Sequence, residues 1–168
     1  DWSSDVWSSD LYAHDELLLN LVTSEEGIES FDAFGFVQLL KEILGERLAG
    51  ILHTINNDSG DRVDPLNGET RRLYGKTTIH ENILGLSFEI SMKSFFQTNP
   101  KSAERLYQKA MEYVESAKGS GTILDLFCGT GTITQLLSRQ GFDHVIGVDI
   151  EEKAIINARE NAHRNNVT

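Results

Sequence analysis

The stretch that decides the fold reads TILDLFCGTGT and occupies positions 122–132. Its first six residues are mostly apolar, which predicts a strand over 122–127 that is buried in a parallel sheet. Gly129 and Gly131 follow at once, and they let the backbone turn sharply and approach a ligand closely because they carry no Cβ. Apolar residues at helical spacing then predict a helix over 133–139.

A second strand and a second helix extend this pattern. The sequence HVIGVD at 144–149 predicts a strand that ends in an acid, and residues 151–165 predict a helix. The order strand, glycine loop, helix and strand with a terminal acid is typical of the opening of a nucleotide-binding parallel sheet. The fold class is therefore α/β, with the first part of a Rossmann-like sheet in the C-terminal half of the chain.

The polar residues of this segment discriminate between ligands. Asp149 can accept hydrogen bonds from a ribose diol, which both dinucleotides and S-adenosylmethionine contain. The dinucleotide fingerprint requires a third glycine where this chain has Thr134. Asp125 would repel a pyrophosphate, whereas it would attract the ammonium and sulfonium groups of S-adenosylmethionine. We therefore expect S-adenosyl-L-methionine to be the cofactor, with NAD as the alternative.

Several motifs together resemble the RNA uracil-C5 methyltransferase family. They are SFFQTN at 94–99, DLFCGTGT at 125–132, GVD at 147–149 and the pair Asn161-Ala162. The resemblance covers about residues 17–166 and is looser before residue 78. It implies a class I methyltransferase fold and methyl transfer from S-adenosylmethionine to uracil C5 in RNA. It is closest to the branch that makes 5-methyluridine in 23S ribosomal RNA, and the tRNA uracil-C5 methyltransferases are the nearer alternative.

The expected cofactor-binding residues are Gln97, Asp125, Phe127, Gly129, Gly131, Thr132 and Asp149. By resemblance, Gln97 contacts the cofactor, Phe127 packs beside it and Asp149 binds the ribose. Thr132 stands where the family often has Asn, so its role departs from the family's pattern.

The resemblance also implies that the only cysteine, Cys128, is not catalytic. The family attacks uracil C6 with a cysteine thiolate that follows an Asp-Pro-Pro-type motif on a later strand. Cys128 matches instead a small residue of the cofactor loop. We therefore expect no catalytic residue within these 168 residues and an inactive chain in isolation, with the nucleophile downstream of its last residue.

The N-terminal half predicts a separate small domain. Residues 1–14, with their WSSD repeat, are expected to be a tail that is disordered or not native. Residues 15–98 are expected to form an α+β domain, and residues 99–168 the methyltransferase part. The predicted elements before the loop are strands at 17–23, 51–56, 79–83 and 86–91 and helices at 34–48 and 100–116.

The charge distribution limits what this chain binds. Its net charge is −11, and residues 1–98 hold 17 acidic and 7 basic residues. Because RNA phosphates require Lys and Arg, we expect weak or no RNA binding by the chain alone. Its local basic cluster, Arg71, Arg72 and Lys76, is interpreted as a solvated turn, with RNA contact as the alternative.

The remaining classes are excluded or kept as alternatives. The five histidines show no metal-ligand spacing, so we expect no metal. A single cysteine, with no membrane span or leader peptide in the sequence, predicts a cytoplasmic protein without a membrane partner. Two other functions stay open: a fragment of an NAD- or FAD-binding oxidoreductase, and a non-catalytic module that binds a nucleoside or only a partner.

Overall fold

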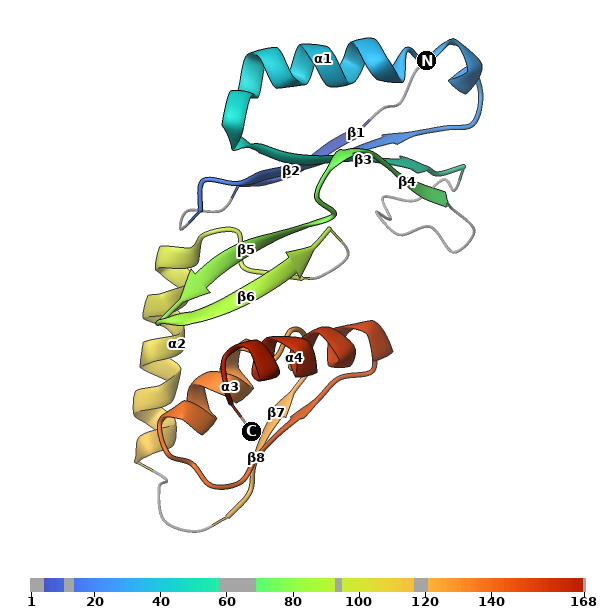
Figure 1. Cartoon of the computed structure of the whole chain (residues 1–168). Helices are drawn as coiled ribbons and strands as arrows, with labels where there is room; N and C mark the ends of the chain where they lie inside the picture. The colour runs from blue at the N-terminus through green and yellow to red at the C-terminus, as the bar shows by residue number, and fades with distance from the viewer. Residues whose placement is uncertain (1–4, 11–13, 58–68, 93–94, 117–120, 168) are drawn as a thin grey trace. The chain divides into compact units, whose positions relative to one another are not determined.

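The computed structural model describes residues 5–10, 14–57, 69–92, 95–116 and 121–167. Contacts divide the chain into two compact units, and each is described below by itself (Figure 1). The first comprises residues 1–79 with 91–93, and the second comprises residues 80–90 with 94–168. Within the described residues, no helix is both long and apolar enough to span a membrane.

The first unit is a four-stranded mixed sheet covered by one helix. Its strands follow the order β1 (Asp5–Asp10), β2 (Leu17–Thr23), β3 (Leu48–Ile55) and β4 (Glu69–Gly75). β2 and β3 are parallel because helix α1 (Ala33–Leu44) carries the chain back between them, whereas β1 and β4 pair antiparallel on the two edges. In Figure 1, α1 lies across one face of this sheet.

The core of the first unit lies between α1 and the sheet. Four buried residues of β2 and β3 form its floor: Leu17, Leu19, Leu48 and Ile51. The residues packed against them are Phe36, Val37, Leu40, Leu44, Leu73 and Tyr74. Leu39 and Ile43, on the other side of the helix, are exposed. Only one stripe of the helix is therefore buried, as expected for a helix on a sheet surface.

Three details of the first unit differ from the sequence predictions. The helix ends at Leu44 instead of residue 48, because Gly45 adopts a positive φ of 57° and Leu48 already belongs to β3. Residues 5–10 of the expected tail form strand β1, paired with β2, while residues 1–4 lie outside the described part. The basic cluster interpreted as a turn lies mostly on strand β4. This strand was not predicted because its segment is polar.

The second unit contains a hairpin, three helices and two parallel strands. The hairpin is formed by β5 (Thr78–Ile83) and β6 (Leu86–Ser91), of which residues 80–90 belong to this unit, and helix α2 (Pro100–Glu115) follows it. Asn99 caps α2, since its Oδ1 accepts the Ser102 N–H at 3.0 Å. Then come β7 (Ile123–Leu126), α3 (Thr132–Arg139), β8 (Val145–Val148) and α4 (Glu152–Arg164). These elements match the predicted order and confirm the mixed α/β fold with the first part of a class I methyltransferase sheet.

The hairpin turn is bound to two helices of the second unit. Its central residues Leu84 and Gly85 both have positive φ, as a type I′ hairpin turn requires. The Leu84 N–H donates to Glu104 of α2 at 2.8 Å, and Arg139 of α3 donates to the Gly85 carbonyl at 2.9 Å. Residues 80–90 therefore group with the second unit, which differs from the boundary expected at residue 98.

Asn161 of α4 and Asn165, the C-cap of this helix, bind the edge of β6 that has no partner strand among the described residues. Asn165 accepts the Ser87 N–H at 2.8 Å and donates to the Ser87 carbonyl at 2.9 Å. One helical turn earlier, Asn161 accepts the Glu89 N–H at 2.9 Å and donates to the Glu89 carbonyl at 3.4 Å. The two amides thus pair with alternate residues of the strand as a neighbouring strand would, because side chains at i and i+4 lie on one helix face.

The pair β7 and β8 is covered on one face only. Residues of both strands alternate between partly buried and exposed positions. On the covered face, a Cβ added to Gly147 would lie 2.7 Å from Thr134 of α3, so helix and strand are in close contact there. The exposed residues of the other face are Leu124, Leu126, Ile146 and Val148.

Candidate functional site

The loop after β7 combines three residues with left-handed backbone. Phe127, Gly129 and Gly131 have φ values of 63°, 54° and 75°. This conformation is uncommon for a residue with a side chain, and Phe127 adopts it while its ring is 85% exposed. The Cys128 N–H donates to the Val148 carbonyl at 3.0 Å, so the loop stays attached to the end of β8. Local strain and an exposed aromatic ring together mark this loop as a candidate ligand contact.

Gly129 and Gly131 serve different purposes in this loop. A Cβ placed on Gly129 would have no atom within 4 Å, so open space lies beside this residue. At Gly131 a Cβ would lie 3.0 Å from Ala158, and Gly131 is also the N-cap of α3. Gly131 therefore permits close packing of α3 against α4, whereas Gly129 leaves room for a ligand.

Asp149 binds the loop through its carboxylate. Its Oδ2 accepts the Gly129 N–H at 2.8 Å, and its Oδ1 accepts the Glu151 N–H at 3.0 Å. These bonds from Glu151 and Gly129 favour the ionised form and lower the pKa of Asp149. Each oxygen retains a further lone pair, so the carboxylate can still accept hydroxyl donors from a ligand beside Gly129.

Asp125 holds the start of α3 in place. Its Oδ2 accepts both the backbone N–H of Thr134, at 3.0 Å, and the Thr134 hydroxyl, at 2.6 Å. A carboxylate beside the first turn of a helix is favourable because the N–H groups there carry partial positive charge. Thr134, which stands where a dinucleotide site has glycine, is thus a hydrogen-bond donor to Asp125.

Tyr107 of α2 joins two predicted site residues. Burial raises the pKa of its hydroxyl, the hydrogen bond with the Gln97 side chain opposes this rise, and the Asp125 carboxylate adds to it. Gln97 and Asp125 are 28 positions apart in the chain, yet both act on this one hydroxyl, Gln97 through a hydrogen bond and Asp125 through its charge. Sequence analysis missed Tyr107 because it sits at a regular apolar position of an amphipathic helix, where an aromatic residue indicates only packing.

The side chain of Thr132 is buried. It is 7% exposed, and its hydroxyl oxygen lies 3.3 Å from that of Thr130. The structure therefore gives its side chain a local partner in the first turn of α3. Four of the other predicted residues form two groups: Gln97 and Asp125 both act on the Tyr107 hydroxyl, and Gly129 is bonded to Asp149.

The environment of Cys128 disfavours a thiolate. Burial raises the pKa of the thiol, and the carboxylates of Asp125 and Asp149 raise it further. Its sulfur would lie 3.0 Å from a Cβ on Gly147, so the side chain points towards β8. A reactive cysteine requires a lowered pKa and positive neighbours, and Cys128 has neither.

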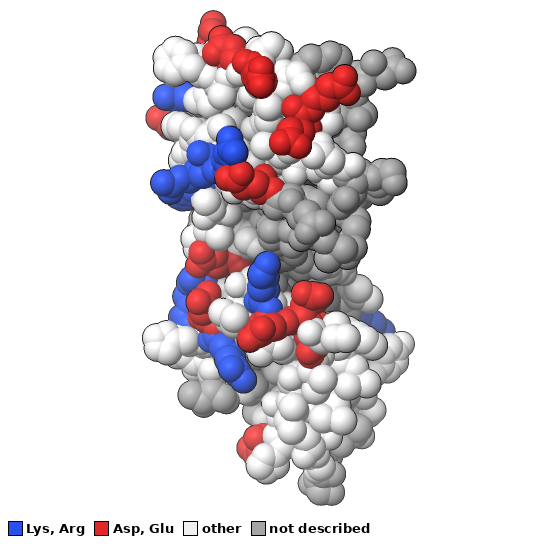
Figure 2. Space-filling model, turned by 90° about the vertical axis from the view of Figure 1, so that its right-hand side faces the viewer, with Lys and Arg blue, Asp and Glu red and all other residues white. Residues whose placement is uncertain are grey.

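Charged residues on the face drawn in Figure 2 form no single patch: red and blue side chains lie interspersed. Within the described ranges, no cluster of three or more His, Cys, Asp or Glu residues could hold a metal ion. The ligand chemistry of this site therefore rests on the loop, the two aspartates and the Gln97–Tyr107 pair.

Comparison with known proteins agrees with this geometry. Residues 117–168 match a family model described as "Methyltransferase domain". The chain is 43% identical over 155 residues to an "Uncharacterized RNA methyltransferase" of Clostridium tetani, a match that covers 90% of the chain and 32% of that protein. The chain is also 39% identical over 151 residues to an "Uncharacterized RNA methyltransferase" of Caldanaerobacter subterraneus, a match that covers 89% of the chain and 32% of that protein.

Solved structures show the same fold. The tRNA (uracil-54, C5)-methyltransferase of Pyrococcus abyssi, in complex with S-adenosyl-L-homocysteine, superposes with a TM-score of 0.64 at 30% identity. This match covers 91% of the chain and 34% of that structure. Trm5b of the same organism, at 19% identity and a TM-score of 0.54, supports the fold alone.

The chain spans about a third of the length of these relatives. The loop fits the cofactor, because open space lies beside Gly129 and the two acids suit a ribose and a cationic methionine part. S-adenosyl-L-methionine is the cofactor of this class of domain. Residues 117–168 thus form the first part of an S-adenosylmethionine-dependent methyltransferase domain, in a chain similar to about one third of the length of RNA methyltransferases.

Proposed function

We propose that the whole protein methylates C5 of uracil in RNA. The observation that carries this proposal is the loop geometry, in which the Gly129 N–H is bonded to Asp149 and space is left beside it. It is supported by the 43% identity to an RNA methyltransferase and by the likeness to a tRNA uracil-C5 methyltransferase. S-adenosylmethionine supplies the methyl group as an electrophilic sulfonium.

Different residues around the loop bind different parts of the cofactor. Asp149 accepts the ribose hydroxyls, and Gly129 leaves room for the adenosine, beside which the exposed Phe127 ring packs. Asp125 lies near the cationic methionine part, and Tyr107 holds the Gln97 side chain towards the same place. Gly131 and Thr132 act through the backbone of the first turn of α3. This division follows from the two groups of residues described above.

The RNA target is proposed to be 23S ribosomal RNA, on the motifs that resemble that branch. The similar enzyme of Pyrococcus abyssi is a tRNA (uracil-54, C5)-methyltransferase, so tRNA is the second candidate. In either case the base must leave its stack to reach a methyl donor in a pocket, so the substrate is an unpaired or extruded uridine. We place this reaction in the cytoplasm.

The chain alone is proposed to bind the cofactor without forming a covalent bond to uracil. Its only cysteine has a raised pKa and points towards β8, so it cannot supply the thiolate that attacks uracil C6. Cofactor binding and catalysis are therefore separable in this protein.

Titration calorimetry of the chain with S-adenosylhomocysteine and with NADH tests the cofactor. We expect heat of binding with the first compound and none with the second. Binding of NADH alone would favour an oxidoreductase and contradict the proposal. For the whole protein, mass spectrometry of RNA incubated with S-adenosylmethionine should detect 5-methyluridine in ribosomal RNA, and 5-methyluridine in tRNA alone would reassign the target.

A further inference from the structure

A pocket lined by both polar and apolar side chains lies on the face of the first unit's sheet opposite α1. Side chains alternate along a strand, so Asn20, Leu52 and Arg72 point away from the core residues Leu19 and Ile51. The cavity has a volume of about 290 Å³. Its lining residues, all from the first unit, are Asn20, Leu52, Thr54, Thr70, Arg72, Thr77, Thr78, Ser91 and Met92.

The floor of the pocket is a buried hydrogen-bonding network. Asn20 and Thr54 are each 1% exposed. The Thr54 hydroxyl donates to Asn20 Oδ1 at 3.0 Å and lies 3.0 Å from the Thr70 hydroxyl. Buried polar groups on adjacent strands are costly unless they have partners, and apolar residues would fill this face more simply. The network fixes the orientation of the Asn20 side chain at the floor of the pocket.

The pocket differs from the rest of its unit in charge. The first unit, residues 1–79 with 91–93, contains 15 acidic residues, yet none of the nine described lining residues is acidic. Arg47, Arg71 and Lys76 of the same unit each form an ion pair with a carboxylate. Arg72 is the lining cation, and no ion pair with a described carboxylate neutralises it. Among the described residues its guanidinium has no carboxylate partner, so it can pair with an anion at the pocket.

We propose that this pocket binds one unpaired nucleotide of the RNA substrate, an inference that rests on the proposed function. An amide and several hydroxyls can pair with the donors and acceptors on the edge of a base, and Leu52 and Met92 supply apolar contact to its ring. Arg72 pairs with the adjacent phosphate. The volume lies near the lower end of the range of about 300–1,000 Å³ for small-ligand sites, which suits a nucleotide.

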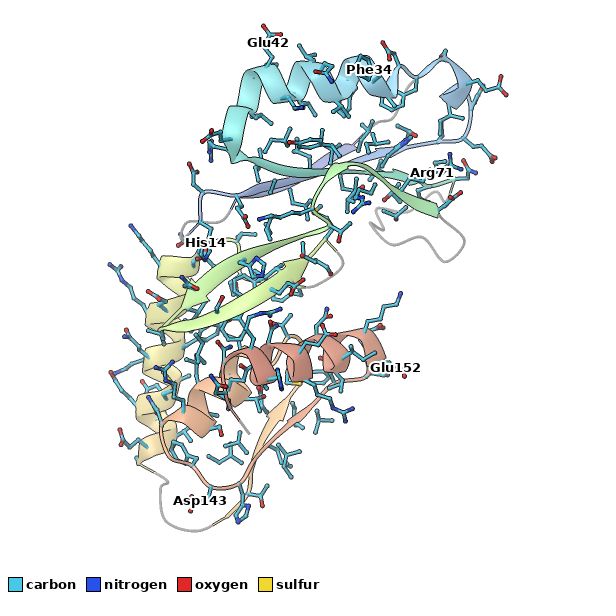
Figure 3. All side chains as sticks on the ribbon, in the orientation of Figure 1. His14, Phe34, Glu42, Arg71, Asp143 and Glu152 are labelled. Carbon is cyan, nitrogen blue, oxygen red and sulfur yellow. The ribbon has the colours of Figure 1, made fainter. Side chains whose placement is uncertain are left out.

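The matched variants are Arg72→Gln and Arg71→Gln. Arg71 is the neighbouring residue on β4, its side chain alternates to the other face, and it is paired with Glu69 at 2.8 Å (Figure 3). The probes are fluorescein-labelled single-stranded hexanucleotides of uridine and of adenosine, titrated with the full chain by anisotropy over a range of NaCl concentrations. Chemical shifts of the Asn20, Thr54 and Thr70 amides are followed in the same titration.

We expect Arg72→Gln to raise the Kd for one or both hexanucleotides about tenfold and to lower the slope of log K against log [NaCl] by about one. Arg71→Gln should change both little, and the three amides should shift only when RNA is added. Equal effects of the two variants, or unshifted amides, would overturn the proposal. So would uridine monophosphate or inorganic phosphate binding as tightly as the hexanucleotide, since the site would then serve a free anion.

The test separates this pocket from the proposed function. S-adenosylhomocysteine binding is measured on the same wild-type sample. If the cofactor product binds and RNA leaves the first unit unchanged, the pocket proposal fails while the methyltransferase proposal stands. If RNA shifts the three amides and S-adenosylhomocysteine does not bind, the pocket is supported as an RNA site and the proposal that the chain alone binds the cofactor fails.

Discussion

Each unit contains two parallel strands joined through one helix, and the two βαβ segments differ sharply in burial. In β2–α1–β3, Leu18 and Ile51 are 0% exposed. In β7–α3–β8, Leu124 is 58% and Ile146 is 50% exposed. The difference lies in the neighbours: β1 and β4 flank the first pair, whereas the second pair has no neighbouring strand within the described residues.

This comparison shows that an apolar strand sequence does not by itself produce a buried strand. Strands at the edge of a sheet keep unpaired backbone groups and exposed side chains, and parallel strands require cover on both faces. Burial stabilises by about 25 cal/mol per Å² of apolar surface, so β7 and β8 gain much less from folding than β2 and β3. The cofactor loop therefore follows a strand of the less stable of the two sheets.

The largest expected effect tests this difference directly. Ile51→Ala should destabilise the first unit by about 2–5 kcal/mol, because it leaves a cavity in a closed core. Leu124→Ala, the matched change in β7, should cost less than about 0.5 kcal/mol because the side chain is already exposed. Urea unfolding of both variants measures this. A large loss for Leu124→Ala would show that its face is covered in solution.

A smaller effect is expected at the ligand end of the second sheet. Asp149→Ala should weaken S-adenosylhomocysteine binding by about 1–3 kcal/mol, since the ribose loses a charged acceptor and the Gly129 N–H loses its partner. Asp143→Ala is the control, because Asp143 lies in the loop before β8 and is exposed (Figure 3). Titration calorimetry measures the affinity of both variants for S-adenosylhomocysteine. Equal affinities would show that Asp149 does not bind the ligand.

The first unit should also respond to pH. Burial lowers the pKa of His53, and the Arg71 guanidinium lowers it further, below the ordinary value of 6.5. Because the unfolded chain then binds the proton more tightly, the stabilisation is present above about pH 6.5 and is lost as pH falls through the folded-state pKa. The melting temperature should drop on acidification towards about pH 5, by less in His53→Gln. The exposed His144→Gln should retain the full drop.

The smallest effect is expected at Cys128. Cys128→Ser should leave methylation by the whole protein within about tenfold of normal, because the residue packs in the loop and supplies no covalent step. Alkylation of Cys128 by iodoacetamide should have its midpoint at a higher pH than that of an ordinary thiol, since its pKa is raised. Covalent trapping of 5-fluorouracil RNA on Cys128 would contradict both expectations.

The elements around the glycine loop were predictable because their signals are local. The Asn99-Pro100 cap, the apolar strands and the loop glycines each act within a few residues, and the structure confirms the resulting elements. Strand β4 was missed because its exposed edge carries Arg71 and Arg72, whose polarity resembles that of a turn. The helix boundary at Leu44 was missed because Gly45 interrupts an apolar period that continues into β3.

The sequence by itself determined the α/β class, the order of elements and the loop that suits S-adenosylmethionine, because periodicity, capping and glycine placement are properties of neighbouring residues. Only the tertiary structure decided that the hairpin belongs with the second unit, that Tyr107 connects Gln97 with Asp125, and that Arg72 borders a pocket. These features depend on contacts between residues far apart in the chain. Such contacts form only when whole elements pack, and no local pattern of residues encodes them.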